Sequence, residues 1–128
     1  MTSTEDPSFA VLVVEDNPLL LMDAMDMAEA AGFRVYGAGN ADQAMRMMND
    51  HADICVLFTD IDMPGSMDGL QLAHLVRDGW PPVGIIVSSG YRKVAEGDLP
   101  EDGLFFSKPY SPEAISNALT GMAKRFPQ

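Results

Sequence analysis

Uniformly apolar segments alternate along this chain with segments whose apolar residues recur at helical spacing. Residues 9–14, 54–59 and 83–87 are rich in Val, Ile and Leu, which is typical of parallel strands buried on both faces. Residues 34–38, a weaker candidate, and residues 104–107 complete a set of five strands. Strands that alternate with helices predict a doubly wound α/β fold, with a parallel sheet and helices on both of its faces.

Signals for helix ends support four helices between and after these strands. An Asn-Pro pair at 17–18 begins the first helix, which Gly32 ends, and Asn40 caps the second. A third helix is expected over about 68–78, because apolar residues fall there at helical spacing before a Gly-Trp-Pro-Pro stop. The last begins with Ser-Pro-Glu at 111–113, a cap followed by a proline and an acid in the first turn.

The segment between the fourth and fifth strands lacks such a signal. Residues 91–103 contain Gly97, Pro100 and Gly103 among several acids, so only residues 91–96 have the composition of a helix. We expect a short helix or an irregular loop in this segment.

Length and composition indicate one globular domain over residues 8–126, after a disordered tail over residues 1–7. The chain has 128 residues, of which 47% are apolar and 21% charged, with room for one core and no separate effector module. With a net charge of −11 and only eight Lys and Arg, it has no basic patch for nucleic acid or anionic membranes. The single Cys55 and the lack of a membrane-length apolar segment favour a cytoplasmic protein.

Acidic residues follow two of the predicted strands. Glu15 and Asp16 come directly after the first apolar segment, and Asp60 comes after residues 54–59. Because the carboxyl ends of parallel strands meet at one edge of the sheet, these three carboxylates are expected to lie close together. Their mutual repulsion calls for a hard divalent cation, and Mg²⁺ prefers such oxygen ligands.

Two other strand ends complete a set of groups suited to phosphate chemistry. Ser89 follows the fourth apolar segment with a hydroxyl, and Lys108 follows the fifth with an ammonium group. A carboxylate nucleophile, a metal site, a hydroxyl and a fixed cation are the groups that phosphoryl transfer uses, because it depends on positioned positive charge. The sequence therefore indicates a phosphoryl-transfer site.

In this order, the motifs resemble those of the receiver domain of two-component response regulators, whose best-known single-domain member is the chemotaxis regulator. The resemblance extends from about Ala10 to Ala123. It implies a flavodoxin-like strand order 2-1-3-4-5. It rests on Val14-Glu15-Asp16-Asn17, Thr59-Asp60-Ile61-Asp62-Met63-Pro64, Met67-Asp68-Gly69, Ser88-Ser89-Gly90 and Phe106-Ser107-Lys108-Pro109.

The resemblance implies a stand-alone, Mg²⁺-dependent phosphoacceptor in a bacterial phosphorelay. Asp60 would take a phosphoryl group from a histidine kinase or a histidine phosphotransfer protein. Asp16 and Asp60 would bind the metal directly, Glu15 would act through water, and the backbone carbonyl of Asp62 would be a further ligand. The protein would catalyse only its own phosphorylation and dephosphorylation, and would signal by contact with an unknown downstream protein.

Three further roles follow from the same resemblance. Ser89 matches the switch hydroxyl that follows the phosphoryl group, and Phe105 matches the aromatic residue that rotates inward on activation. Lys108 would pair with a phosphoryl oxygen, and its peptide bond to Pro109 is expected to be cis, a form that X-Pro bonds tolerate at low cost. The sequence departs from the family pattern in a longer loop after Asp60 and a shorter interval between Ser89 and Lys108.

Plainer interpretations stand beside these roles. Glu15 and Asp16 could be acids at a helix N-terminus. The side chain of Asp62 is as well explained by an exposed loop acid as by an effect on turnover. His51 and His74 are expected to be solvated.

Two other functions are compatible with part of this pattern. A phosphatase of the haloacid dehalogenase type also uses an Asp nucleophile, but its cap domain does not fit in this chain. A pseudo-receiver would be an interaction module that never needs phosphate.

Overall fold

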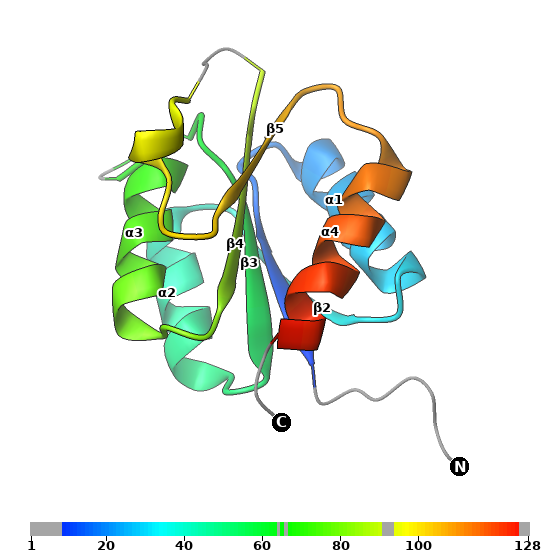
Figure 1. Cartoon of the computed structure of the whole chain (residues 1–128), viewed down its shortest axis with the longest axis horizontal. Coiled ribbons are helices and arrows are strands. Elements are labelled where there is room, and N and C mark those ends of the chain that lie inside the picture. Colours follow the sequence, from blue (N-terminus) through cyan, green and yellow to red (C-terminus); the bar gives the residue numbers. More distant parts are fainter. Residues whose placement is uncertain (1–8, 64, 66, 91–93, 126–128) are drawn as a thin grey trace.

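The computed structural model describes residues 9–63, 65, 67–90 and 94–125. In this part of the chain, five parallel strands form one sheet in the order β2-β1-β3-β4-β5 (Figure 1). The strands are β1 (Ala10–Val14), β2 (Arg34–Ala38), β3 (Ile54–Asp60), β4 (Gly84–Ser89) and β5 (Leu104–Ser107). The predicted fold class and strand order are confirmed.

Four α-helices in the described residues cover the two faces of this sheet. One face carries α1 (Pro18–Ala30) and α4 (Pro112–Arg125), and the other carries α2 (Ala41–Asp50) and α3 (Gly69–Gly79) (Figure 1). Each predicted helix is present, with ends shifted by no more than a residue or two. The predicted tail over residues 1–7 lies outside the described residues.

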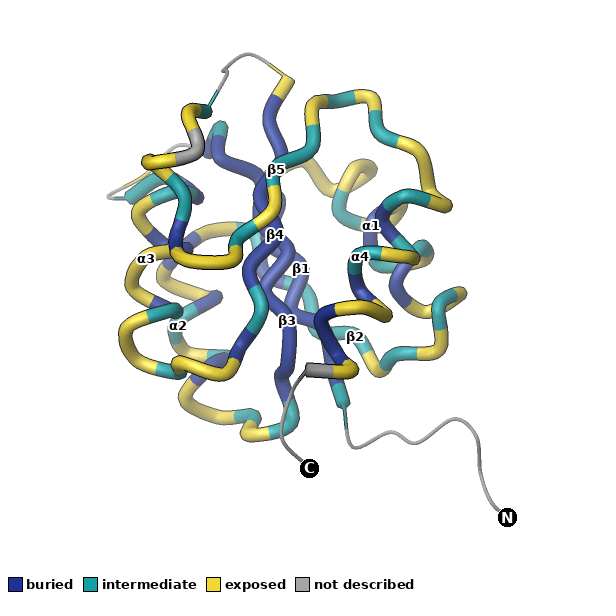
Figure 2. Tube along the Cα trace, viewed as in Figure 1, coloured by how far each residue is buried: buried dark blue, intermediate teal, exposed yellow. Residues whose placement is uncertain are grey.

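Side chains of the central strands alternate between two apolar cores, one on each face. Leu12, Leu57 and Ile85 pack toward α2 and α3, whereas neighbouring residues such as Phe58 and Ile86 pack toward α1 and α4. Because β1 and β3 are buried on both faces, they form the dark centre of the molecule in Figure 2. Each fully buried Leu, Ile or Phe contributes about 1.5–3 kcal/mol, so these strands fix the register of the whole sheet.

That register aligns the carboxyl ends of the strands. Val14 pairs with Thr59, Asp60 with Ser88, and Ser89 with Ser107, so the residues that follow β1, β3, β4 and β5 meet at one edge. Strand β4 extends past the apolar segment to Ser89, because its polar end still takes part in the ladder.

Asn17 and Asn40 cap α1 and α2, as the sequence predicts. Asn17 Oδ1 accepts hydrogen bonds from the backbone N–H groups of Leu19 and Leu20, at 2.9 and 3.3 Å, which turns the chain away from the sheet directly after the first two acids. Asp68 caps α3 in a capping box with Gln71. The site is therefore flanked by two well-anchored helix N-termini.

The predicted irregular segment before β5 is confirmed in its described part. Of residues 94–103, only Glu96–Asp98 forms a helical turn, the 3-10 helix η1. His74 of α3 bonds through Nε2 to the carbonyl of Asp98 at 2.7 Å, and Arg77 donates to the carbonyl of Glu101. These contacts join the segment to α3. The expectation that a helix could begin at residue 91 falls on residues 91–93, outside the described part.

The expectation of two solvated histidines is half wrong. His74 is exposed, but His51 is half-buried and stacks on Tyr36 with ring centroids 4.0 Å apart. Tyr36 in turn donates its hydroxyl to the carboxylate of Asp53 at 3.0 Å. The stacking joins the end of α2 to β2, a contact between segments that helical spacing does not reveal.

Candidate functional site

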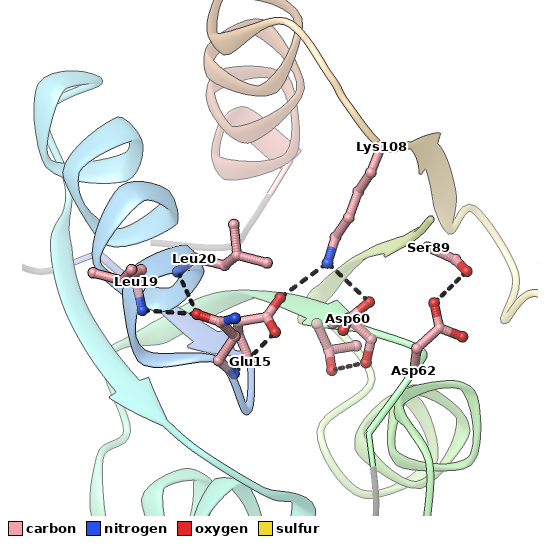
Figure 3. A network of polar contacts seen from close by, with 9 residues as sticks. Glu15, Leu19, Leu20, Asp60, Asp62, Ser89 and Lys108 are labelled. Carbon is pink, nitrogen blue, oxygen red and sulfur yellow. Dashed lines mark hydrogen bonds and ion pairs between the residues drawn. The ribbon is translucent and has the colours of Figure 1, made fainter. Parts of the chain in front are cut away.

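The candidate site lies at the carboxyl edge of the sheet, where four strand ends meet. Glu15 follows β1, Asp60 ends β3, Ser89 ends β4 and Lys108 follows β5, and Figure 3 shows their side chains gathered there. Glu15 and Asp60 are buried, with 6% and 5% of their surface exposed, whereas Asp16 is exposed. The structure thus brings together the acids, the hydroxyl and the ammonium group that the sequence analysis placed at this edge.

Lys108 links the two buried carboxylates. Its Nζ lies 3.0 Å from Glu15 Oε1 and 3.3 Å from Asp60 Oδ1 (Figure 3). Glu15 also accepts a hydrogen bond from the backbone N–H of Asn17 at 3.2 Å. Burial lowers the pKa of Lys108, but the hydrogen bond with Glu15 and the charge on Asp60 outweigh this effect and raise it. The ammonium group is therefore held in its charged form beside Asp60.

The surroundings of Asp60 disfavour its ionised form. Burial and the neighbouring charge of Glu15 raise the pKa of Asp60 to about 6, although Lys108 and the nearby backbone N–H of Asp62 act in the opposite direction. Asp60 Oδ1 is buried and accepts no hydrogen bond from the residues that the structure describes, so its contact there is the ion pair with Lys108. A buried carboxylate oxygen without a hydrogen bond is costly and is suited to accept a new electrophilic partner.

The donor set of this edge fits a hard divalent cation. One carboxylate oxygen each from Glu15, Asp16 and Asp60 lies within 4.8 Å of the others. Together with Asp62, they line a pocket of about 370 Å³ that opens beside Lys108. Carboxylate oxygen ligands and a net negative charge match the requirements of Mg²⁺.

The backbone carbonyl of Asp60 is contacted by Gly69 and by the hydroxyl of Thr59. A Cβ on Gly69 would lie 1.9 Å from the carbonyl oxygen of Asp60, so only glycine allows α3 to begin this close to the end of β3. Thr59 Oγ1 donates to the same carbonyl at 3.0 Å. The sequence analysis noted Gly69 only as part of a motif, and its contact with the acceptor depends on a chain reversal that spacing alone does not reveal.

The side chain of Asp62 has a contact that the sequence analysis did not foresee. Ser89 Oγ donates a hydrogen bond to Asp62 Oδ2 at 2.6 Å (Figure 3). Asp62 was expected to contribute its backbone carbonyl, and its side chain was left as a possible loop acid. The structure instead joins this side chain to the predicted switch hydroxyl.

The remaining predicted positions are also located. Phe105 is half-buried and packs against the core beneath α2 and α3, opposite Val87 of β4. The Lys108-Pro109 peptide bond is cis, as expected. No helix in the described part of the chain is both long and apolar enough to cross a membrane.

An α/β sheet of this order, with acids, a hydroxyl and an ammonium group gathered at its carboxyl edge, is the arrangement that the sequence analysis associated with receiver domains. Comparison with known sequences agrees, because the profile described as "Response regulator receiver domain" matches residues 11–120. The chain belongs to the response regulator receiver domain family. Receiver domains are signalling modules of two-component systems, and this membership decides against the phosphatase alternative.

Individual relatives are distant. The chain is 28% identical to the sensor kinase CckA of Brucella abortus over 92% of its own length and 13% of the relative's. It is 25% identical to the phyllosphere-induced regulator PhyR of Methylorubrum extorquens, over 90% of its own length and 43% of the relative's. It therefore spans less than half of either relative. A response regulator receiver protein from Sinorhizobium medicae superposes with a TM-score of 0.84, at 25% identity over 91% of this chain and 94% of that one.

Proposed function

We propose that this chain accepts a phosphoryl group on Asp60 from a histidine kinase or a histidine phosphotransfer protein. The observation that carries the proposal is the buried carboxylate of Asp60, whose Oδ1 accepts no hydrogen bond from the residues that the structure describes and lies 3.3 Å from Lys108 Nζ. This oxygen is the natural nucleophile. It would form the new P–O bond as the P–N bond to the donor histidine breaks and the bonding electron pair returns to the imidazole.

The other residues of the site would supply binding and charge. Glu15, Asp16, Asp60 and the backbone carbonyl of Asp62 would hold Mg²⁺. When bound, Mg²⁺ would neutralise the carboxylates and the phosphoryl oxygens. Lys108, whose Nζ lies 3.3 Å from Asp60 Oδ1, would pair with one phosphoryl oxygen, and Ser89 would donate its hydroxyl to another. Burial of the Asp60 side chain, which is 5% exposed, would limit access of water to the carbonyl carbon of the acyl phosphate.

Output would follow from rearrangement around Ser89. Ser89 lies at the end of β4, and the chain continues from there to η1. Movement of Ser89 would therefore alter a nearby surface that contacts a downstream protein. Phe105 lies on the neighbouring strand and would repack by apolar contact alone, since it has no hydroxyl.

Phosphorylation of the purified protein tests the proposal. Acetyl phosphate with Mg²⁺ should add one phosphoryl group, detected by intact mass, and the label should be lost in hydroxylamine, as expected of an acyl phosphate. Asp60→Asn should abolish labelling, whereas Asp26→Asn, which removes an exposed acid of α1, should not. Stable labelling of a Ser or Thr in Asp60→Asn would contradict the proposal. Absence of labelling in the wild type would favour a phosphate-independent interaction module.

A further inference from the structure

The Ser89–Asp62 hydrogen bond engages the hydroxyl that the proposed mechanism needs at the phosphoryl group. Ser89 Oγ and Asp62 Oδ2 are 2.6 Å apart, within the range of charge-assisted bonds between a hydroxyl and a carboxylate. Figure 3 shows the two side chains pointing toward one another beside Asp60. Ser89 is only 2% exposed, so competition from water is weak and the bond is strengthened by its surroundings.

A serine hydroxyl has a single O–H to donate. While that hydrogen is donated to Asp62, Ser89 presents only lone pairs to any other partner. A phosphoryl oxygen is also an acceptor, so the two oxygens would repel each other. The hydroxyl of Ser89 can therefore satisfy either Asp62 or a phosphoryl group on Asp60, but not both.

The backbone of Ser89 is fixed by hydrogen bonds, whereas its side chain is able to rotate between the two partners. Its carbonyl accepts a hydrogen bond from the backbone N–H of Lys108 at 3.0 Å, and Ser89 pairs with Ser107 in the ladder between β4 and β5. Asp62 lies just beyond β3, where the neighbouring Ile61 donates its N–H to the carbonyl of Ser88 at 2.8 Å. A change of partner therefore begins with rotation of the Ser89 side chain between staggered rotamers.

We propose that Asp62 is a positioning residue that holds Ser89 in the orientation of the unphosphorylated protein, so that phosphorylation of Asp60 must break the Ser89–Asp62 bond. The inference rests on the function proposed above. Because the bond exists only in the free form, its free energy opposes the phosphorylated form and lowers the apparent affinity for a phosphoryl group. This sets a threshold for activation that no role of the Asp62 backbone carbonyl would supply.

The Asp62 carboxylate can also oppose phosphoryl binding through its negative charge, independently of its hydrogen bond to Ser89. This carboxylate lines the same pocket as Glu15 and Asp60, so its charge alone disfavours a bound anion. Asp62→Asn removes the charge but keeps an oxygen that accepts a hydrogen bond, whereas Asp62→Ala removes both. Ser89→Ala removes the donor, so in that background the difference between the two Asp62 variants should vanish.

The experiment measures binding of beryllofluoride in the presence of Mg²⁺ by calorimetry, with ¹⁹F NMR to confirm occupancy at Asp60. With Ser89 present, Asp62→Ala should bind beryllofluoride about tenfold more tightly than the wild type, and about fivefold more tightly than Asp62→Asn, as expected from the loss of a charge-assisted or a neutral hydrogen bond. In the Ser89→Ala background, Asp62→Ala and Asp62→Asn should bind equally. A double-mutant cycle on urea unfolding of the free proteins should also show coupling between the two residues.

Each alternative result has a definite meaning. Equal affinities of Asp62→Ala and Asp62→Asn in both backgrounds would show that charge alone acts, and would overturn the inference. So would the absence of coupling in the free proteins, whatever the beryllofluoride result. Failure of every variant, including the wild type, to bind beryllofluoride would overturn the proposed function itself, and with it this inference.

Discussion

Replacement of the acceptor by a neutral residue of the same shape should stabilise the metal-free protein. Asp60 is 5% exposed, its Oδ1 accepts no hydrogen bond from the described residues, and Glu15 adds a like charge to the same pocket. Asp60→Asn removes the buried charge and leaves Lys108 paired with Glu15 at 3.0 Å. Because the ionised Asp60 carboxylate is destabilising in the absence of metal, Asp60→Asn should raise the free energy of unfolding of the metal-free protein.

The size of the effect follows from the raised pKa of Asp60. The shift from an ordinary pKa of 3.8 to about 6 corresponds to a destabilisation of about 3 kcal/mol when Asp60 is ionised. Because Asn retains part of the cost of burial, we expect a gain of about 1–2 kcal/mol at pH 7.5, or about 3–8 °C in Tm. Between about pH 4 and pH 6, folded Asp60 binds a proton that the unfolded chain has lost. Wild-type stability should therefore fall, relative to Asp60→Asn, as the pH rises through that window.

The assay is urea unfolding in EDTA at several pH values between 4 and 8, followed by circular dichroism. Asp26→Asn is the matched control, because it removes one exposed acid of α1 and should change stability by less than about 0.5 kcal/mol. The advantage of Asp60→Asn should be full at pH 7.5 and disappear near pH 4. An Asp60→Asn variant no more stable than Asp26→Asn at pH 7.5, or an advantage that does not change with pH, would refute the electrostatic account of the site.

Three further predictions concern the metal, the chain reversal and the segment before β5. Mg²⁺ at about ten times its Kd should raise wild-type stability by about 1.4 kcal/mol in thermal unfolding and should raise that of Asp60→Asn by less; equal gains would show that Asp60 is not a ligand. Gly69→Ala should cost about 2 kcal/mol or more and slow labelling by acetyl phosphate, since its Cβ would meet the Asp60 carbonyl, whereas Gly79→Ala, with nothing within 4 Å, should be tolerated. Comparable stability of the two glycine variants in urea would contradict this assignment. Beryllofluoride should slow amide hydrogen exchange in residues 94–104 as Ser89 changes partner, and unchanged exchange there would place the output on another face.

The strands and the charged part of the site could be predicted from the sequence because one physical pattern determines both. A segment such as residues 54–59 can be buried on both faces only in the middle of a parallel sheet, and the acid that follows it must then lie at the carboxyl edge. The same reasoning placed Glu15 and Lys108. It also placed Ser89 at the end of β4, where Ser88 and Ser89 continue the ladder after the apolar segment ends at Val87.

Contacts made by loops and by side chains far apart in sequence could not be predicted in this way. His51 was expected in solvent but stacks on Tyr36, because the turn after α2 folds it back onto β2. Gly69 meets the Asp60 carbonyl only because the loop after β3 returns over the end of that strand. In both cases the partners are fixed by the path of the chain between elements, for which hydrophobic spacing carries no signal.

The site therefore has two parts with different physical origins. Its charges lie at the ends of buried strands, whose register is fixed by the apolar core. The Ser89–Asp62 bond instead joins the rigid end of β4 to the first residues of the loop after β3. A substitution in that loop can change the balance between the two partners of Ser89 without moving the groups that would carry out phosphoryl transfer. Under the proposed function, the strands would determine whether Asp60 can react, and the loop would determine how readily Ser89 changes its hydrogen-bond partner.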